Sequence, residues 1–472
     1  MSGSAFAARF LTCVHDAHHR LARVARWCRG RACPRKPATA AHLGFGYLGR
    51  LPGSGLRLKR LSMRAPHMPS PEHTPVIVAA KRTPIGKYLG GLAALTAPQL
   101  GGHAIAAALA ASGVPAGLIE EVIMGHVLQG GTGQAPARQA ALRGGVPVTA
   151  SAVAINKVCG SGLKAVMLAA QAIKAGDRSV LVAGGQESMS NAPHYVYGIR
   201  GGVKLGDQTL VDGMIRDGLH CASCHVHMGG HAEHTAQKGQ VNRADQDAFA
   251  AESHRKAIAA QQAGKFTAEI APVSIPGRKG PTVVSVDEGP RADTTAESLA
   301  GLRPAFGTDA PTDMAAGDLS VTAGNASSLN DGGAALVITS EAVAKAHGLQ
   351  IMARITGYAT GAVEPKDLFF APITAVQTLM RQQGTNIADY GLIEANEAFA
   401  SQALANGRGL HWDWDRVNVH GGAIALGHPI GASGARVLVT LLHAMRDRDV
   451  ETGLATLCLG GGDAVALSVS RV

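Results

Sequence analysis

Apolar residues between positions 75 and 127 fall into short segments of two kinds. The segment PVIVAAKRTPIG (75–86) is a continuous apolar run that ends in a Pro/Gly turn, which predicts a buried strand. The segment LGGHAIAAALAASGV (100–114) is typical of a helix, and EEVIMGHV (120–127) predicts another strand. Because strands alternate with helices, the pattern predicts a layered α/β fold.

The same order of elements occurs a second time near the C-terminus. The first set is strand EEVIMGHV, strand VAINKVCGSG, helix LKAVMLAAQAI and strand SVLVAGGQES. The second set is strand YGLIEANEAF, then RVNVHGGAIALGHPIGASG, helix ARVLVTLLHAM and strand GLATLCLGGGDAVAL. Gly125 and Ser161 are 36 residues apart, and Asn396 and Ser433 are 37 apart. The spacing predicts two copies of one βαβ-rich unit.

This duplication predicts four parts of the chain. The segment between the copies lacks their order and is rich in His, Gly and charged residues, so we expect it to cover the substrate. The predicted parts are a basic leader (1–67), an N-terminal half (68–188), an inserted loop domain (189–325) and a C-terminal half (326–472).

Composition favours a large globular protein of this kind. The 472 residues are 46% hydrophobic but only 4% aromatic, and 60 are glycine, which indicates close backbone packing. The seven cysteines are odd in number and scattered, which argues against a disulfide framework and for a reducing compartment, so we expect a cytoplasmic protein. The sequence contains no run of 18 apolar residues, so we predict no membrane-spanning helix.

The net charge of +10 belongs to the leader. Residues 1–67 hold 13 of the 44 Lys and Arg but only one of the 34 acids, Asp16, which leaves 31 basic and 33 acidic residues elsewhere. A nucleic-acid binder needs its charge within the folded body, so the composition disfavours that class. Three interpretations of the leader remain open: a transit peptide, a polyanion-binding arm, or sequence upstream of a true start at Met68. We favour the last, because Met68 directly precedes the first strand and the leader lacks an amphipathic pattern.

Candidate chemistry lies where matching ends of the two copies are expected to meet. Cys159, Asn396, His428 and Cys458 are found there, each beside glycines. Cys159 precedes a helix that begins near Gly160, whose N–H groups and dipole would favour a thiolate. His428 has the chemistry to take a thiol proton. A cysteine in a glycine turn is more often a buried structural residue, so spacing alone leaves both interpretations open.

Several segments together resemble the thiolase family. They are VCGSGLKAV (158–166), GGQESMS (184–190), HMGG (227–230), TAGNASSLNDGGA (322–334), EANEAFA (394–400), VNVHGGAIALGHPIGASGAR (417–436) and LCLGGG (457–462). They occur in the family's order across residues 75–472 and are most similar to the biosynthetic thiolases. The resemblance implies duplicated halves in an α-β-α-β-α arrangement with an inserted loop domain.

The resemblance also implies a reaction and a role for each matching residue. Two molecules of acetyl-CoA would condense to acetoacetyl-CoA and CoA, reversibly, through an acyl group held on Cys159. His428 would activate Cys159, and Cys458 would take or return the proton on the second acetyl group. Asn396 would hold a water that forms one oxyanion hole with His428, and the N–H groups of Cys159 and Gly460 would form the second.

For binding, the resemblance implies that Ser327 contacts the pantetheine arm of CoA and that His227 and Met228 line the acyl pocket. Leu368 takes a position that is often Met in biosynthetic enzymes, which bears on chain length. The expected partners are acyl-CoA and CoA alone, without metal or other cofactor, nucleic acid or membrane, in a homotetramer or homodimer.

Rival activities follow from the same residues. The nearest is a 3-ketoacyl-CoA thiolase for longer chains, which would use the same residues in a wider pocket. A decarboxylating synthase would not need Cys458, and a non-catalytic lipid carrier would be expected to lack one of the four residues at the site.

One motif lies outside this scheme. CASCH (221–225) fits a haem-attachment pattern, and with His220, His227, His231 and His234 it resembles a metal cluster. Thiolases usually carry an acidic, aromatic-bearing stretch here, whereas this chain has HCASCHV. We predict no metal, because so short a pattern recurs by chance. The role of His220, Cys221, Cys224 and His225 stays open.

Overall fold

The computed structural model describes residues 70–472. The predicted leader (1–67) and the proposed start at Met68 lie outside the described residues. Within the part that is described, no helix is both long enough and apolar enough to cross a membrane.

In residues 70–472, ten strands join into one sheet. Their order is β12-β13-β14-β11-β1-β10-β5-β3-β4, with β2 paired to β10. The strands are β1 (Pro75–Arg82), β2 (Gly86–Lys87), β3 (Glu121–Gly125), β4 (Ser151–Ile155), β5 (Val180–Ser188), β10 (Asn330–Ser340), β11 (Ala353–Ala362), β12 (Leu392–Ala395), β13 (Thr452–Leu459) and β14 (Asp463–Ser470).

Strand order confirms the duplication predicted from the sequence. In the first half, β3 is parallel to β4 and β5, and the antiparallel pairs β5–β10 and β10–β1 follow. The second half repeats this with β12 parallel to β13, then β13–β14 and β14–β11. Its counterpart of β4 is only a bridge between Ile393 and Val417. The halves join where β1 pairs with β11.

The sequence prediction was wrong at the last strand. The segment 453–467 is a hairpin of β13 and β14, in which Cys458 lies opposite Ala464. Gly461 and Gly462 have φ angles of 90° and 88°, a region that glycine enters without the clash of a Cβ atom. The glycine run is therefore the turn that reverses the chain directly after Cys458.

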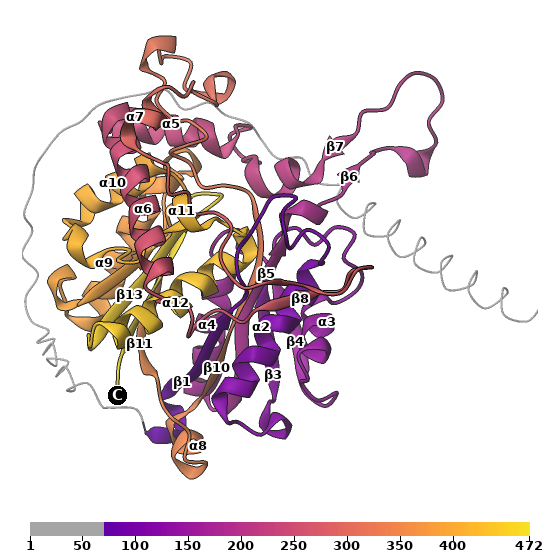
Figure 1. Cartoon of the computed structure of the whole chain (residues 1–472), viewed down its shortest axis with the longest axis vertical. Helices are drawn as coiled ribbons and strands as arrows, with labels where there is room; N and C mark the ends of the chain where they lie inside the picture. Colours follow the sequence, from indigo (N-terminus) through magenta and orange to yellow (C-terminus); the bar gives the residue numbers. More distant parts are fainter. Residues whose placement is uncertain (1–69) are drawn as a thin grey trace, which may run out of the picture. The chain divides into compact units, whose positions relative to one another are not determined.

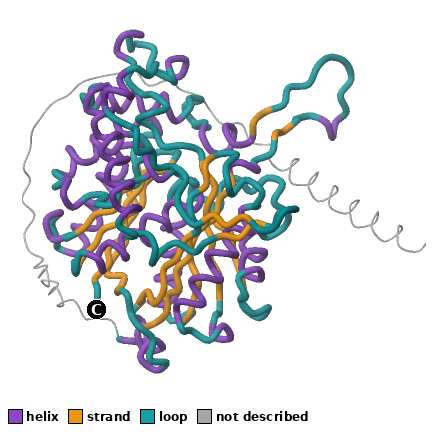
Figure 2. Tube along the Cα trace, in the orientation of Figure 1, coloured by secondary structure: helices purple, strands orange, loops and turns teal. Residues whose placement is uncertain are grey.

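Helices cover both faces of each half of the sheet. The helices between the two halves form one shared layer, which gives the predicted α-β-α-β-α order. The helices α4 (Ser161–Ala175) and α12 (Ile430–Asp447) share one core with strands of both halves. The pair α2 (Ala97–Ser112) and α3 (Pro136–Arg143) packs on the outer face of the first half. On the outer face of the second half lie α9 (Ala371–Gln383) and residues of α10 (Ala400–Leu410). Figures 1 and 2 show helices on both sides of the strands.

Glycine lets the two central helices approach each other closely. A Cβ atom on Gly162 of α4 would lie 2.6 Å from the backbone nitrogen of Ala435, and one on Gly434 of α12 would lie 2.3 Å from that of Leu163. Both distances are shorter than van der Waals contact, so these positions require glycine. The close approach brings the N-terminal ends of α4 and α12 together, and these ends follow Cys159 and His428.

The segment 189–325 has little sheet structure, as its pattern predicted, although the boundaries of the predicted domains stay predictions. Its elements are β6 (His194–Tyr195), β7 (Val211–Asp212), α5 (Met228–Lys238), α6 (Arg243–Gln262), β8 (Val273–Ile275), β9 (Thr282–Val284) and α7 (Ala296–Ala300). Two further α-helices among residues 70–472 are α8 (Glu341–Ala346) and α11 (Ala423–Leu426).

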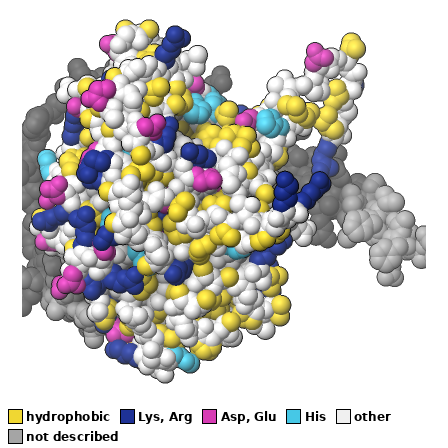
Figure 3. All heavy atoms as spheres, viewed as in Figure 1, with side chains coloured by type: hydrophobic (Ala, Val, Ile, Leu, Met, Phe, Trp, Pro, Cys, Tyr) yellow, Lys and Arg dark blue, Asp and Glu magenta, His cyan; other side chains and the backbone are white. Residues whose placement is uncertain are grey.

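An arm between β6 and β7 extends from the rest of residues 70–472 (Figure 1). Figure 3 shows hydrophobic side chains along this arm. Leu205 is 98% exposed and Leu210 is 66% exposed. Val196, Tyr197 and Ile199 are exposed as well. An isolated exposed apolar residue needs no explanation, but several on one arm are typical of a contact surface.

Candidate active site

A cavity of about 400 Å³ lies where the N-terminal ends of the central helices meet the end of β13. Eight of the nine site residues predicted from the sequence line it: Cys159, His227, Met228, Ser327, Leu368, His428, Cys458 and Gly460. The remaining lining is mainly apolar and includes Met189, Met214, Phe306, Phe369, Phe399 and Ile430. The structure therefore brings together residues from both halves and from the segment between them.

Cys159 sits on a turn with unusual backbone geometry. The preceding residue, Val158, has a φ angle of 45°, which a β-branched side chain rarely adopts. Two hydrogen bonds hold the turn: Val158 N–H donates to Asn156 Oδ1 (2.9 Å), and Lys157 N–H donates to Ser161 Oγ (2.8 Å). The Lys157 ammonium also pairs with Asp463 at the start of β14. The turn is thus fixed against the glycine hairpin of the other half.

Cys159 rests as a protonated thiol. Burial raises the pKa of its thiol to about 12, because a thiolate would lose its hydration there. The backbone N–H groups of Cys159 and Gly460 act in the opposite direction but are outweighed. The local N–H groups thus favour a thiolate, as predicted, but burial outweighs them, and Cys159 needs a base to remove its proton.

His428 is arranged to act as that base. Ser433 Oγ donates its proton to the carbonyl of Pro429 (2.9 Å), so it accepts from His428 Nδ1 at 2.6 Å. This hydrogen-bond pattern assigns the ring proton to Nδ1 and leaves a lone pair on Nε2. His428 N–H donates to Asn330 Oδ1 (2.9 Å), which fixes the backbone. Burial, and secondarily the charge of Arg436, lower the pKa of His428 to about 3, so the ring is neutral.

Cys458 is the second thiol of the cavity and is almost fully buried at the end of β13. Burial raises its pKa well above the usual range, and the nearby Cys159 raises it further. It packs in an apolar cluster with Leu368, Phe369 and Phe399. Both cysteines therefore rest as neutral thiols.

Asn396 is the predicted site residue that does not line the cavity. It follows β12, and its N–H donates to the carbonyl of Thr456 (3.0 Å), two residues before Cys458. Its side chain is buried, and neither amide atom has a hydrogen-bond partner among residues 70–472. His428 Nε2 likewise has no partner in the described chain. Buried polar atoms of this kind are usually satisfied by water or ligand.

The predicted binding residues occupy the other walls. His227 precedes α5, and its Nδ1 accepts a hydrogen bond from Gly229 N–H (3.0 Å). Its ring stacks on Phe306 at a centroid distance of 5.1 Å, and burial lowers its pKa. Ser327 is held by a hydrogen bond from its N–H to the carbonyl of Ala398 (3.0 Å). Leu368 is completely buried, so it closes the cavity with apolar surface.

Three positioning residues were not predicted from the sequence. Ser433 fixes the His428 tautomer, and Asn330 holds the His428 backbone. Glu187 accepts hydrogen bonds from the N–H groups of Val127, Leu128 and Gly431, which connect the end of β5 to the start of α12. Burial raises the pKa of Glu187 to about 7. The signal for Ser433 was its place one helical turn beyond His428, whereas nothing local marked the other two.

Comparison with protein families agrees with this architecture. Residues 75–342 match the family of thiolase N-terminal domains, and residues 349–471 match that of thiolase C-terminal domains. The two matches together span nearly all of the described chain.

Individual relatives are similar over the same region. An acetyl-CoA acetyltransferase of Pseudomonas aeruginosa is 54% identical over 397 residues, and one of Escherichia coli is 52% identical over 398; each match covers 84% of this chain and 99% of the relative. The crystal structure of the Bacillus anthracis acetyl-CoA acetyltransferase superposes with a TM-score of 0.81 at 41% identity. That match covers 85% of this chain and 99% of the solved one.

Proposed function

The chain belongs to the thiolase family, and from this premise we propose that it is an acetyl-CoA C-acetyltransferase, condensing two acetyl-CoA to acetoacetyl-CoA and CoA. The observation that carries the proposal is the presence of two neutral thiols and a neutral His428 in one cavity. The acetyltransferases to which it is 50–54% identical favour this reaction over a longer-chain thiolase.

The first half-reaction transfers an acetyl group to the protein. His428 Nε2 takes the proton of Cys159, and the sulfur attacks the thioester carbonyl of acetyl-CoA. We expect the N–H groups of Cys159 and Gly460, which act on the Cys159 sulfur, to stabilise the oxyanion that forms. As the C–S bond to CoA breaks, Cys458 gives its proton to the departing CoA thiolate. The protein then holds an acetyl thioester on Cys159, an imidazolium on His428 and a thiolate on Cys458.

The second half-reaction forms the carbon–carbon bond. The Cys458 thiolate removes a proton from the methyl group of the second acetyl-CoA, and the enolate oxygen is stabilised by the His428 imidazolium and a water held by Asn396. The enolate carbon attacks the acetyl group on Cys159, and the Cys159 thiolate leaves and recovers its proton from His428. Charges and protons balance over the cycle, so the chemistry needs no metal or redox cofactor and uses CoA only as substrate and product.

Chain length provides the test of this proposal. The full-length protein is expected to cleave acetoacetyl-CoA in the presence of CoA at least about tenfold faster, in kcat/KM, than a six- to eight-carbon 3-ketoacyl-CoA, because Leu368 and the Phe306–Phe399 pair close a small apolar cavity. Steady-state thiolysis of both substrates measures this ratio. Equal or faster cleavage of the longer substrate would assign the chain to the broad 3-ketoacyl-CoA thiolases instead.

Ser433→Ala tests the proposed base. The change removes the acceptor of the buried His428 Nδ1–H, which costs about 1–3 kcal/mol and frees the ring to change tautomer. We expect kcat for thiolysis to fall about tenfold to a hundredfold while KM changes little, as when other orienting partners are removed. Ser112→Ala removes a similarly buried hydroxyl at the end of α2 and is expected to leave kcat unchanged. An unaltered kcat in Ser433→Ala would contradict the assigned tautomer.

Assembly and compartment are further proposals. We expect a homo-oligomer, a tetramer or a dimer, and the support for it is the exposed apolar arm between β6 and β7. The scattered cysteines of the sequence support a reducing compartment, so we expect the protein in the cytoplasm.

A further inference from the structure

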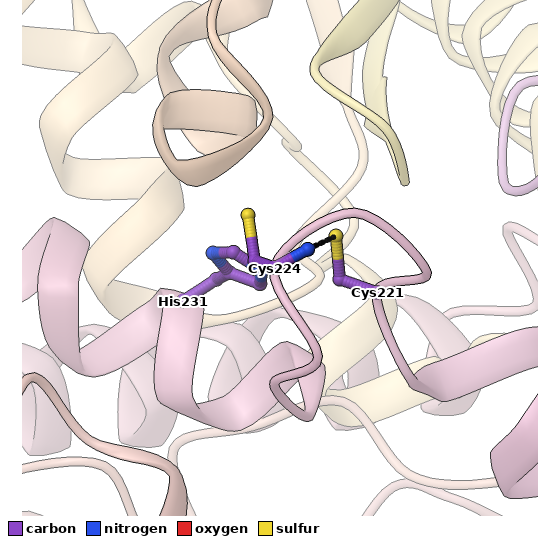
Figure 4. Close-up of side chains that lie close together, drawn as sticks. All are labelled: Cys221, Cys224 and His231. Carbon is purple, nitrogen blue, oxygen red and sulfur yellow. Dashed lines mark hydrogen bonds between the residues drawn. The ribbon is translucent and has the colours of Figure 1, made fainter.

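The CASCH segment, which the sequence analysis left without a role, takes part in a three-residue cluster. Cys221 and Cys224 lie on one turn, and His231 lies one helical turn into α5. One ligand atom from each, the two sulfurs and a ring nitrogen, lie within 4.8 Å of one another. Figure 4 shows the three side chains side by side, the cysteines on their loop and His231 on the helix.

Backbone hydrogen bonds hold the cysteine turn in place. Cys221 N–H donates to the carbonyl of Val226 (2.8 Å), and His225 N–H donates to that of Cys221 (2.9 Å). Cys224 N–H donates to Cys221 Sγ at 3.3 Å, a bond that strengthens when the sulfur carries a negative charge. The turn therefore presents both sulfurs on a fixed backbone and already supplies one hydrogen bond to a thiolate.

His231 supplies an independent indication of a ligand. His231 is 3% exposed, and its Nε2 has no hydrogen-bond partner among the residues that the structure describes. A buried imidazole nitrogen without a partner is available to bind a metal ion.

We propose that Cys221, Cys224 and His231 bind a zinc ion. Two thiolates and an imidazole are the ligand set that Zn²⁺ prefers, and tetrahedral coordination at 2.0–2.3 Å would place the ligand atoms about 3.5–3.8 Å apart. The observed separations of up to 4.8 Å need movement of about 1 Å, which rotation of the side chains supplies. A solvent molecule completes the fourth position.

The geometry favours a metal ion over haem. Haem attachment through C-x-x-C-H uses the histidine next to the second cysteine, which here is His225. The cluster instead contains His231, from a different element, while the ring of His225 lies 6.4 Å from that of His220. Convergence of residues from a turn and a helix is what a metal ion requires.

The site would stabilise the wall of the acyl cavity. His227 and Met228 lie between Cys224 and His231 in the chain and line that cavity. Cys221 lines a neighbouring hollow, which shares Met228 and Gly460 with it. The zinc ion would thus fix the loop that carries the acyl-pocket residues, and it takes no part in the bond-making steps.

Metal analysis of the full-length protein tests the proposal. Protein purified in the presence of zinc and then dialysed is expected to retain about one zinc per chain, and Cys224→Ser and His231→Gln are each expected to lower this at least about tenfold. Cys159→Ser is the matched control, because the active-site cavity also contains two cysteines and a histidine. Zinc content should stay the same in this control even though activity is lost.

A second measurement does not depend on the folding of the variants. Titration of the metal-free wild-type protein with Co²⁺ is expected to produce an intense thiolate-to-cobalt charge-transfer band that saturates at one equivalent. Four results would overturn the proposal: no zinc and no band in the wild type, zinc lost in Cys159→Ser but kept in Cys224→Ser, a Cys221–Cys224 disulfide in the purified protein, or a haem absorption spectrum.

Discussion

Cys159→Ala is expected to lower the rate of CoA-dependent acetoacetyl-CoA cleavage by at least about a thousandfold. The structure places one other thiol in the cavity, Cys458, which is buried at the end of β13. The N–H groups of Cys159 and Gly460 act on the Cys159 sulfur, so Cys458 cannot replace it as the nucleophile. Without Cys159 no covalent acyl intermediate forms, and the remaining groups can only polarise the substrate.

Two measurements check this result. Steady-state thiolysis gives the loss in kcat, and mass spectrometry of protein mixed with acetyl-CoA gives the acetyl adduct, which is expected on wild type and absent in Cys159→Ala. Cys28→Ser removes a thiol of the basic leader, outside both regions that match thiolase domains, and serves as the control for loss of a cysteine. Activity of Cys159→Ala within about tenfold of wild type would exclude the acyl-cysteine mechanism.

The gathering of the site could be predicted because it follows from repetition. Cys159 and His428 precede the corresponding helices α4 and α12, and Cys458 ends the strand after α12. When two copies of one unit pack through these helices, the helix starts must meet, whatever the details of the side chains. The sequence pattern predicted that Cys159, Asn396, His428 and Cys458 would meet; Cys159, His428 and Cys458 line one cavity, whereas Asn396 lies outside its lining.

Properties that depend on contacts distant in sequence could not be predicted. The dipole at the start of α4 suggested a thiolate, but the pKa of Cys159 is set mainly by burial under neighbouring elements. The tautomer of His428 depends on whether the Ser433 hydroxyl accepts a hydrogen bond from the ring or donates one to it. The hydroxyl donates to the Pro429 carbonyl and therefore accepts from the ring. Likewise, five histidines surround the two CASCH cysteines in the sequence, and only the packing of α5 selects His231.

The position of Cys458 leads to the second large effect. Cys458→Ala is expected to lower both condensation and thiolysis about a thousandfold or more, because no other group in the cavity can exchange a proton with the acetyl methyl carbon. At this step His428 already carries the proton of Cys159 and stabilises the enolate oxygen, so it cannot act as the base. The loss should therefore fall on the carbon–carbon step rather than on acylation.

This difference separates the roles of the two thiols. Cys458→Ala is expected to become acetylated by acetyl-CoA and to exchange labelled CoA into acetyl-CoA within about tenfold of the wild-type rate, since the His428 imidazolium can also protonate the departing CoA. Cys159→Ala should lose both half-reactions. Loss of CoA exchange in Cys458→Ala, in a protein with wild-type unfolding temperature, would show that His428 cannot replace Cys458 as the proton donor to CoA and that Cys458 is required in both half-reactions. Retention of exchange with loss of condensation would place the second proton transfer on Cys458, because a carbon acid as weak as a thioester cannot be deprotonated fast enough without a base held next to it.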